Sequence, residues 1–202
     1  MRDLRGLTSL SPIAGDPALL RDTFTDTDKA LTAHTMDRGG GWSVLAGTWE
    51  IASNQAKAVP TIPDSVATAD AGAANGTITA DVTVPNTTNY STGIVARASD
   101  VSNFILIIIT RSGGTAALMM LTKIANSYTV RGQNNFSVPP TGTTVPLTVT
   151  LNGDTITASA PNVSPVSYST TFNNTVTKHG FYDSTTYAGN APGYFDNFLV
   201  TP

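Results

Sequence analysis

The stretch from His179 to Tyr194 holds most of the side chains that could bind a small molecule. Aromatic rings can stack on the apolar faces of sugars, while amide and charged groups hydrogen-bond to sugar hydroxyls. Arg97 adds a donor, because its alternation with Val95 predicts a side chain that points away from the core. If the protein binds a glycan, we expect the binding residues to be Arg97, Tyr182, Tyr187, Asn190 and Tyr194, with Asp183 beside them.

His179, Asp183 and Ser184 are the residue types of a catalytic triad, but their spacing does not fit one. Ser184 directly follows Asp183, without the strand-to-helix turn that exposes a nucleophilic serine. The other histidine, His34, has no metal-binding spacing around it. The chain has no cysteine, which excludes disulfides, thiolate catalysis and Cys-ligated zinc. We therefore expect no enzymatic activity.

The charge balance excludes two classes of partner. Charged residues make up 12% of the chain and the net charge is −3, with no cluster of Lys or Arg. Neither nucleic acid nor an anionic membrane surface is therefore expected as a partner. No segment approaches the roughly 18 apolar residues of a membrane-spanning helix. The N-terminus lacks the apolar core of a signal peptide, so we expect a protein made in the cytoplasm without such a signal.

Short alternating runs separated by turn residues predict β-strands along most of the chain. Apolar residues alternate over 78–84 and 145–151, and Asn152-Gly153 then predicts a hairpin. Gly113-Gly114 predicts a second hairpin, within a meander formed by 93–100, 103–110 and 116–121. Because helical periodicity is nearly absent, the pattern favours an all-β, two-sheet antiparallel jelly-roll sandwich.

The middle strand of that meander is apolar at six successive positions, 104–109. Successive side chains of a strand point to opposite faces, so both faces of this strand need cover. One face can be the core of the domain. We expect the other to be a protein contact formed by Ile105, Ile107, Ile109 and Met119, although the sequence leaves open which set points inward.

Four segments together resemble a known superfamily. They are 22–28 (DTFTDTD), 41–49 (GWSVLAGTW), 93–104 and 193–200 (GYFDNFLV). In this order they are similar to the concanavalin A-like lectin/glucanase, or laminin-G-like, jelly rolls. The resemblance implies one jelly-roll domain over 22–202, preceded by an extended N-terminal arm over 1–21. Such domains occur in lectins, glycosidases, carbohydrate-binding modules and tailed-phage virion accessory proteins.

The resemblance also implies two kinds of site to look for. Members often hold a structural calcium where the first and last strands meet, which places Asp22 and Asp196 as ligands; the alternative is that Asp196 hydrogen-bonds to backbone. No other cofactor is expected. Hydrolases of the glucanase branch need paired carboxylates, whereas this chain has a single glutamate, Glu50.

These observations together predict a non-enzymatic virion component, such as a capsid decoration or small tail protein. It would dock through the N-terminal arm and the apolar sheet face onto other virion proteins or copies of itself. Two alternatives remain open at this point. One is a glycan-binding adhesin or carbohydrate-binding module that binds a host surface glycan, and the other is a glycoside hydrolase with an unrecognised carboxylate pair.

Overall fold

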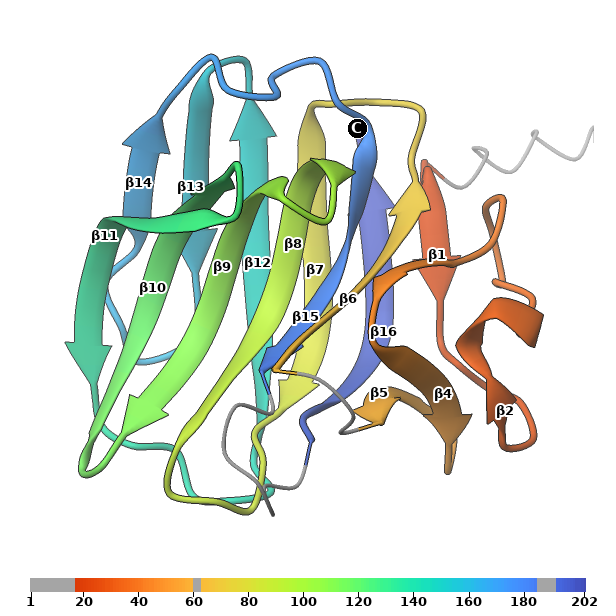
Figure 1. Cartoon of the computed structure of the whole chain (residues 1–202), viewed down its shortest axis with the longest axis horizontal. Helices are drawn as coiled ribbons and strands as arrows, with labels where there is room; N and C mark the ends of the chain where they lie inside the picture. Colours follow the sequence, from red (N-terminus) through yellow and green to blue (C-terminus); the bar gives the residue numbers. More distant parts are fainter. Residues whose placement is uncertain (1–16, 60–62, 185–191) are drawn as a thin grey trace, which may run out of the picture.

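The computed structural model describes residues 17–59, 63–184 and 192–202. Apart from one 3-10 turn, η1 (Leu31–Ala33), the regular structure of these residues consists of β-strands. They form two sheets, paired antiparallel throughout and packed face to face (Figure 1). The predicted all-β, two-sheet antiparallel sandwich is confirmed. No helix among the described residues is long and apolar enough to cross a membrane.

The two sheets differ in size and in the length of their strands. The nine-stranded sheet runs in the order β14 (Val166–Ser169), β13 (Thr155–Ser159), β12 (Thr144–Asn152), β7 (Gly76–Thr83), β16 (Tyr194–Thr201), β5 (Gln55–Val59), β4 (Thr48–Ala52) and β2 (Lys29–Ala30), with β1 (Leu20–Asp22) also paired to β16. The seven-stranded sheet runs β11 (Ser127–Phe136), β10 (Thr115–Ile124), β9 (Asn103–Ser112), β8 (Tyr90–Asp100), β15 (Lys178–Ser184), β6 (Asp64–Asp70) and β3 (Ser43–Ala46).

The tight turns between neighbouring strands occur where residues accept a positive φ angle. Both hairpins expected from glycine are present: Gly113 has a φ of 58° between β9 and β10, and Gly153 a φ of 56° between β12 and β13. A third hairpin, between β10 and β11, turns through Ala125 and Asn126, with φ angles of 48° and 67°. Ala125 gives no turn signal, so the sequence did not predict that hairpin.

Strand β9 is covered on both faces by its own chain. Ile105, Ile107 and Ile109 are fully buried and point into the core between the sheets. Phe104, Leu106 and Ile108 belong to a second apolar cluster on the outer face of the same sheet. The two clusters settle which side chains of β9 point inward, a question that the unbroken apolar run left open.

The N-terminal boundary of the domain lies slightly before the expected position. Leu20 and Arg21, placed in the arm by the sequence, belong to strand β1, which pairs with β16 through Leu20 and Val200. Leu20 is buried in the core between the sheets. Residues 1–16 of the predicted arm lie outside the described residues.

A buried charge cluster holds the segment after β1 against the sandwich. The ring nitrogens of His34 lie 2.8 Å from Asp22 Oδ1 and 3.0 Å from Asp26 Oδ2. The other oxygen of Asp22 accepts a hydrogen bond of 2.7 Å from the Trp42 indole. A neutral imidazole can donate from only one nitrogen, so two carboxylate partners favour the protonated ring. Burial by itself lowers the pKa of His34. The hydrogen bonds and charges of the two aspartates raise it, and together they outweigh the effect of burial, so the pKa of His34 lies above its usual value.

Replacing His34 by glutamine tests this cluster. Because the folded-state pKa is raised, the protonated His34 contributes its full stabilisation below the unfolded pKa of about 6.5, and loses it as pH rises through the folded pKa. We expect His34→Gln to lower the free energy of unfolding by about 1 to 3 kcal/mol at pH 5.5, and by less at pH 9. Urea denaturation at the two pH values measures this, and an equal loss at both would contradict a charged His34.

Candidate functional site

The outer face of the seven-stranded sheet has a groove of about 260 Å³. Its floor is aliphatic and comes from two neighbouring strands, with Leu106 opposite Leu121 and Ile108 opposite Met119. Met119 is half-buried, while the other three are almost covered. The floor is therefore a shallow apolar surface on a rigid pair of strands.

Gly93 adds no side chain to the outer face of the sheet between Tyr182 and Ile108, two residues that line the groove. Gly93 of β8 pairs with Tyr182 on one side and with Ile108 on the other. It faces the groove, since Ser91 lines the groove and side chains two residues apart share a face. A Cβ at Gly93 would lie 2.2 Å from the carbonyl oxygen of Ile107. Only glycine fits there.

Two tyrosines that line the groove are joined through one aspartate. The Tyr182 hydroxyl donates to Asp64 Oδ1 at 2.7 Å, and the Tyr128 hydroxyl donates to Asp64 Oδ2 at 2.8 Å. Tyr128 comes from the edge strand β11, whereas Asp64 begins β6 on the other side of the sheet. We call this arrangement of Tyr128, Asp64 and Tyr182 the tyrosine bridge. The bridge joins β11 to β6, although four other strands lie between them in the sheet. The sheet must therefore curve around the groove for these side chains to meet.

The electrostatics of the bridge keep both phenols as donors. Burial and the Asp64 charge raise the pKa of Tyr182 and of Tyr128 well above the usual value. The Lys123 ammonium lies 3.6 Å from Asp64 Oδ2, and 5.3 and 5.0 Å from the ring centres of Phe104 and Tyr128. Its side chain is 7% exposed, against 31% for Asp64. The charge that solvent meets at the bridge is therefore the negative one.

Hydroxyl groups also line the groove. Ser91 Oγ lies 2.9 Å from Thr110 Oγ1, and Thr110 in turn donates to the Tyr90 carbonyl at 3.0 Å. Because the Thr110 hydrogen is used in that way, Ser91 is the donor of the first bond, and its oxygen can still accept. The groove thus combines an aliphatic floor, two phenol rings and hydroxyls, and both phenols hydrogen-bond to the Asp64 carboxylate beside it. This combination suits a small ligand with both apolar faces and hydroxyl groups.

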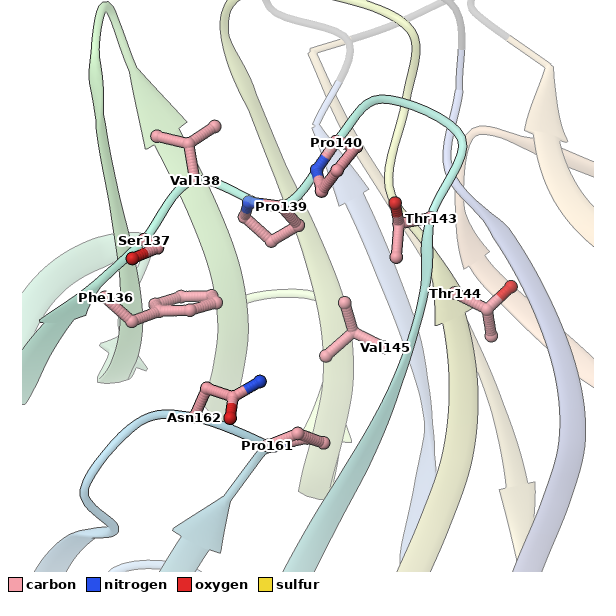
Figure 2. Close-up of a pocket in the computed structure, with 10 residues that line it drawn as sticks. All are labelled: Phe136, Ser137, Val138, Pro139, Pro140, Thr143, Thr144, Val145, Pro161 and Asn162. Carbon is pink, nitrogen blue, oxygen red and sulfur yellow. The ribbon is translucent and has the colours of Figure 1, made fainter.

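A second cavity, of about 250 Å³, lies at one end of the sandwich between β11, the loop after it and β12 (Figure 2). Its lining is mostly apolar, with Phe136, Val138 and Val145 among its residues, and Ser137, Thr143, Thr144 and Asn162 supply the polar groups. No charged side chain appears among the residues that line this cavity in the described structure. It offers fewer directional contacts than the groove, which we take as the candidate site.

The residues predicted to bind a glycan do not form one surface. Tyr182 lies in the groove, whereas Tyr194 is on the outer face of the other sheet, where its ring lies 5.8 Å from the Lys57 ammonium. Tyr194 precedes the inward-pointing Phe195, so it faces away from the core. Tyr187 and Asn190 lie outside the described residues.

The prediction for Arg97 is wrong, because this side chain is fully buried. Its guanidinium donates to the carbonyls of Ala74 and Gly153 at 3.1 and 2.7 Å, and to the Asn75 side chain at 3.0 Å. Its backbone N–H donates to the ring of His179. Burial is the main cause that lowers the pKa of His179 to about 4, so this ring stays neutral. Arg97 joins loops at one end of the sandwich and offers no donor at the surface.

The predicted protein contact also needs correction. Ile105, Ile107 and Ile109 point into the core between the two sheets and expose no surface to a partner. The reason is that successive side chains of β9 point to opposite faces, and the odd-numbered ones point inward. Met119 is on the opposite face and belongs to the groove floor.

The two predicted calcium ligands lie near each other but are held differently. Asp22 is fully buried, and protein donors already fill three of its lone pairs, from His34, Trp42 and the Phe24 backbone. Asp196 Oδ1 accepts the Asn197 backbone N–H at 2.7 Å, as the alternative expected. Burial, with the charges of Asp81 and Asp22, raises the pKa of Asp196. Within the described ranges, no three acidic or histidine residues are grouped to hold a metal, and the calcium site stays a prediction.

Asp183 is the residue next to Tyr182, and it points into the sandwich. Asp183 is 1% exposed, and its Oδ1 accepts a hydrogen bond of 3.2 Å from the Gly193 backbone N–H. In the described part of the chain, Oδ2 and the buried hydroxyl of Ser65, which is opposite Asp183 in the sheet register, have no hydrogen-bond partner. Burial raises the pKa of Asp183 to about 7, although the Gly193 N–H and the Thr92 hydroxyl act to lower it. Such a carboxyl could act as a general acid, but it faces away from the groove.

Comparisons with known proteins identify the fold. No protein-family model matches the chain, and no curated protein matches it. The carbohydrate-binding module CBM66 from Bacillus subtilis superposes with a TM-score of 0.59 at 15% identity, covering 81% of this chain and 97% of the module. The β-glucanase of Bacillus licheniformis gives a TM-score of 0.56 at 11% identity, covering 90% of this chain and 97% of the glucanase.

A third similar structure is longer than this chain. The GH43 protein BlXynB from Bacillus licheniformis has a TM-score of 0.64 at 11% identity; 90% of this chain matches 39% of that protein. At these identities the likeness shows the fold alone. The shared fold agrees with the concanavalin A-like jelly roll that the sequence segments indicated.

The variant Asp183→Asn tests whether ionisation of the buried Asp183 carboxyl destabilises the fold. A raised pKa means that ionisation destabilises the fold: the cost is absent below about pH 4, grows as pH rises and levels off above about pH 7. We expect Asp183→Asn to match the wild type at pH 4 and to be more stable at pH 8, by up to about 4 kcal/mol.

The matched control is Asp100→Asn. Hydrogen bonding by the Asn103 side chain lowers the pKa of this exposed carboxylate, so its removal should cost stability at pH 8. Thermal or urea denaturation at both pH values gives the comparison. A loss of stability for Asp183→Asn at pH 8 would show that its carboxylate has a stabilising partner.

Proposed function

We propose that the protein is a non-catalytic glycan-binding domain, and that its ligand lies in the groove on the outer face of the seven-stranded sheet. The observation that carries the proposal is the juxtaposition of the aliphatic floor with the tyrosine bridge. A sugar ring has apolar C–H faces and a periphery of hydroxyls. The floor can cover a C–H face, while Asp64, the phenols and Ser91 are hydrogen-bonding groups for the hydroxyls.

The comparisons support the same class of function without establishing it. CBM66 is described as a carbohydrate-binding module, and it matches this chain over nearly its full length. The fold alone does not select a function, because the glucanase shares it as well. The contents of the groove therefore carry the argument.

The groove favours binding over hydrolysis. A retaining glycosidase needs two carboxyl groups about 5 Å apart, and an inverting enzyme needs two about 6.5 to 9.5 Å apart. Asp64 is the carboxylate that the bridge tyrosines contact. Asp183 directly follows Tyr182 in the sequence, but its side chain points into the sandwich and so does not supply the second carboxyl group.

The virion role predicted from the sequence has no observation in its favour. Its apolar contact, Ile105, Ile107 and Ile109, is buried within the domain, and residues 1–16 of its docking arm lie outside the described residues. No finding tests a virion location.

A glycan array followed by calorimetric titration tests the proposal. We expect the wild-type protein to bind a defined glycan saturably. We expect Met119→Arg to abolish binding, because the long charged side chain would fill the groove from a half-buried position. The control is Thr150→Arg, which adds the same side chain at an exposed position on the outer face of the other sheet.

Circular dichroism and thermal denaturation should show both variants folded. Binding by Thr150→Arg and none by Met119→Arg would place the glycan in the groove. Equal binding by Met119→Arg and wild type would refute the groove as the site, and an array without any bound glycan would refute glycan binding altogether.

A further inference from the structure

Asp64 has hydrogen-bonding capacity that the described part of the chain does not use. A carboxylate has about four lone-pair positions. The two phenols take one on each oxygen, at 2.7 and 2.8 Å, and the Lys123 ammonium stands 3.6 Å from Oδ2. Among the described residues, Oδ1 accepts from the Tyr182 hydroxyl alone, which leaves a second lone pair on this oxygen. With 31% of its side chain exposed, Asp64 can offer this lone pair to a ligand.

The surroundings fix the orientation of this acceptor. The bridge tyrosines hold the carboxylate from two sides, and their raised pKa values keep them as donors. Because the protein already orients the carboxylate, a ligand hydroxyl that meets it loses little additional conformational freedom. A hydrogen bond from a neutral donor to a fixed carboxylate is among the stronger kinds in proteins.

The same carboxylate opposes anionic ligands. Lys123, the cation nearest to it, is 7% exposed and lies against the rings of Phe104 and Tyr128. The described residues that line the groove include no charged side chain of either sign, and Asp64 stands beside them, bonded to the two lining phenols. A uronate or sulfate group at the bridge would meet the negative charge of Asp64 without an accessible cation to pair with. Like charges at close range in a partly desolvated site repel strongly.

We propose that Asp64 is the specificity-determining residue of the groove and restricts it to neutral glycans, by accepting a hydrogen bond from a sugar hydroxyl and repelling acidic groups. This inference rests on the proposed function, since it names the ligand class of the same site. It assigns a role to a residue that does not itself line the groove floor and that the sequence did not single out.

The experiment uses the full chain and matched pairs of oligosaccharides, one neutral and one with a uronic acid at a single position. The wild type should bind the neutral member and discriminate against the acidic one. Asp64→Asn should bind the neutral glycan at least about tenfold more weakly, because a charged hydrogen bond is lost. It should also discriminate less against the acidic glycan, because the repulsion is gone.

Asp81→Asn is the matched control. Asp81 also accepts a side-chain hydrogen bond, from Asn197, but it lies in β7 of the nine-stranded sheet. This variant should bind both glycans as the wild type does. Thermal denaturation would show whether Asp64→Asn is folded. If it is not, monodeoxy derivatives of the neutral glycan replace it: one of them should bind the wild type at least about tenfold more weakly than the parent sugar.

The possible failures are distinct. If the wild type binds no glycan, the proposed function itself fails. If the wild type binds a glycan in the groove but takes acidic and neutral members equally, or if folded Asp64→Asn keeps full affinity, the glycan-binding function stands and the role of Asp64 is refuted. Equal affinity for every monodeoxy derivative would likewise refute a hydroxyl bound by Asp64.

Discussion

The structure depends on the need to cover both faces of strand β9. Ile105, Ile107 and Ile109 point one way and Phe104, Leu106 and Ile108 the other, and all six are nearly or fully buried. The inward set is covered by the opposite sheet, as in any sandwich. The outward set is covered by its own sheet, which curves until Tyr128 of β11 meets Asp64 of β6. The tyrosine bridge thus helps to cover the aliphatic cluster, and the curvature that covers the cluster brings the residues of the bridge together.

The cover over the outer face is incomplete, and the remaining opening is the groove. The bridge protects Phe104 fully, but Gly93 leaves a gap in the row of side chains between Tyr182 and Ile108. Filling this gap would require a Cβ close to the Ile107 carbonyl, which the backbone pairing forbids. The site is therefore a consequence of strand pairing, and its floor is as rigid as the sheet. Rigid floors favour binding, because little conformational entropy is lost when a ligand settles on them.

The sequence predicted the fold better than the site, for physical reasons. Alternation and turn residues identify strands locally, so the meander of β8, β9 and β10 and the hairpins at Gly113 and Gly153 could be predicted. An unbroken apolar run does not show which alternate residues point inward, so the direction of the Ile105 side chain could not be predicted. Tyr182 was identified because its aromatic neighbours are close in sequence. Asp64 and Tyr128 were missed, because their contact spans 64 residues and arises only from the curvature of the sheet. Arg97 has a φ of 52° at an irregularity in β8, where simple alternation fails.

The period of two residues in β15 decides which of its side chains face the groove. Tyr182 faces the groove and Asp183 faces the interior, so a shift of one residue would exchange them and place a second carboxyl on the side of Asp64. Phe181 prevents that shift. Its ring stacks on Phe195 at 4.4 Å and on Trp42 at 5.0 Å, within the most aromatic part of the core. A shift of one residue would turn the Phe181 ring to the outer face and turn the Tyr182 hydroxyl into the core, away from Asp64. Aromatic packing between the sheets thus keeps Tyr182, and not Asp183, at the groove, where the Tyr182 hydroxyl donates to Asp64.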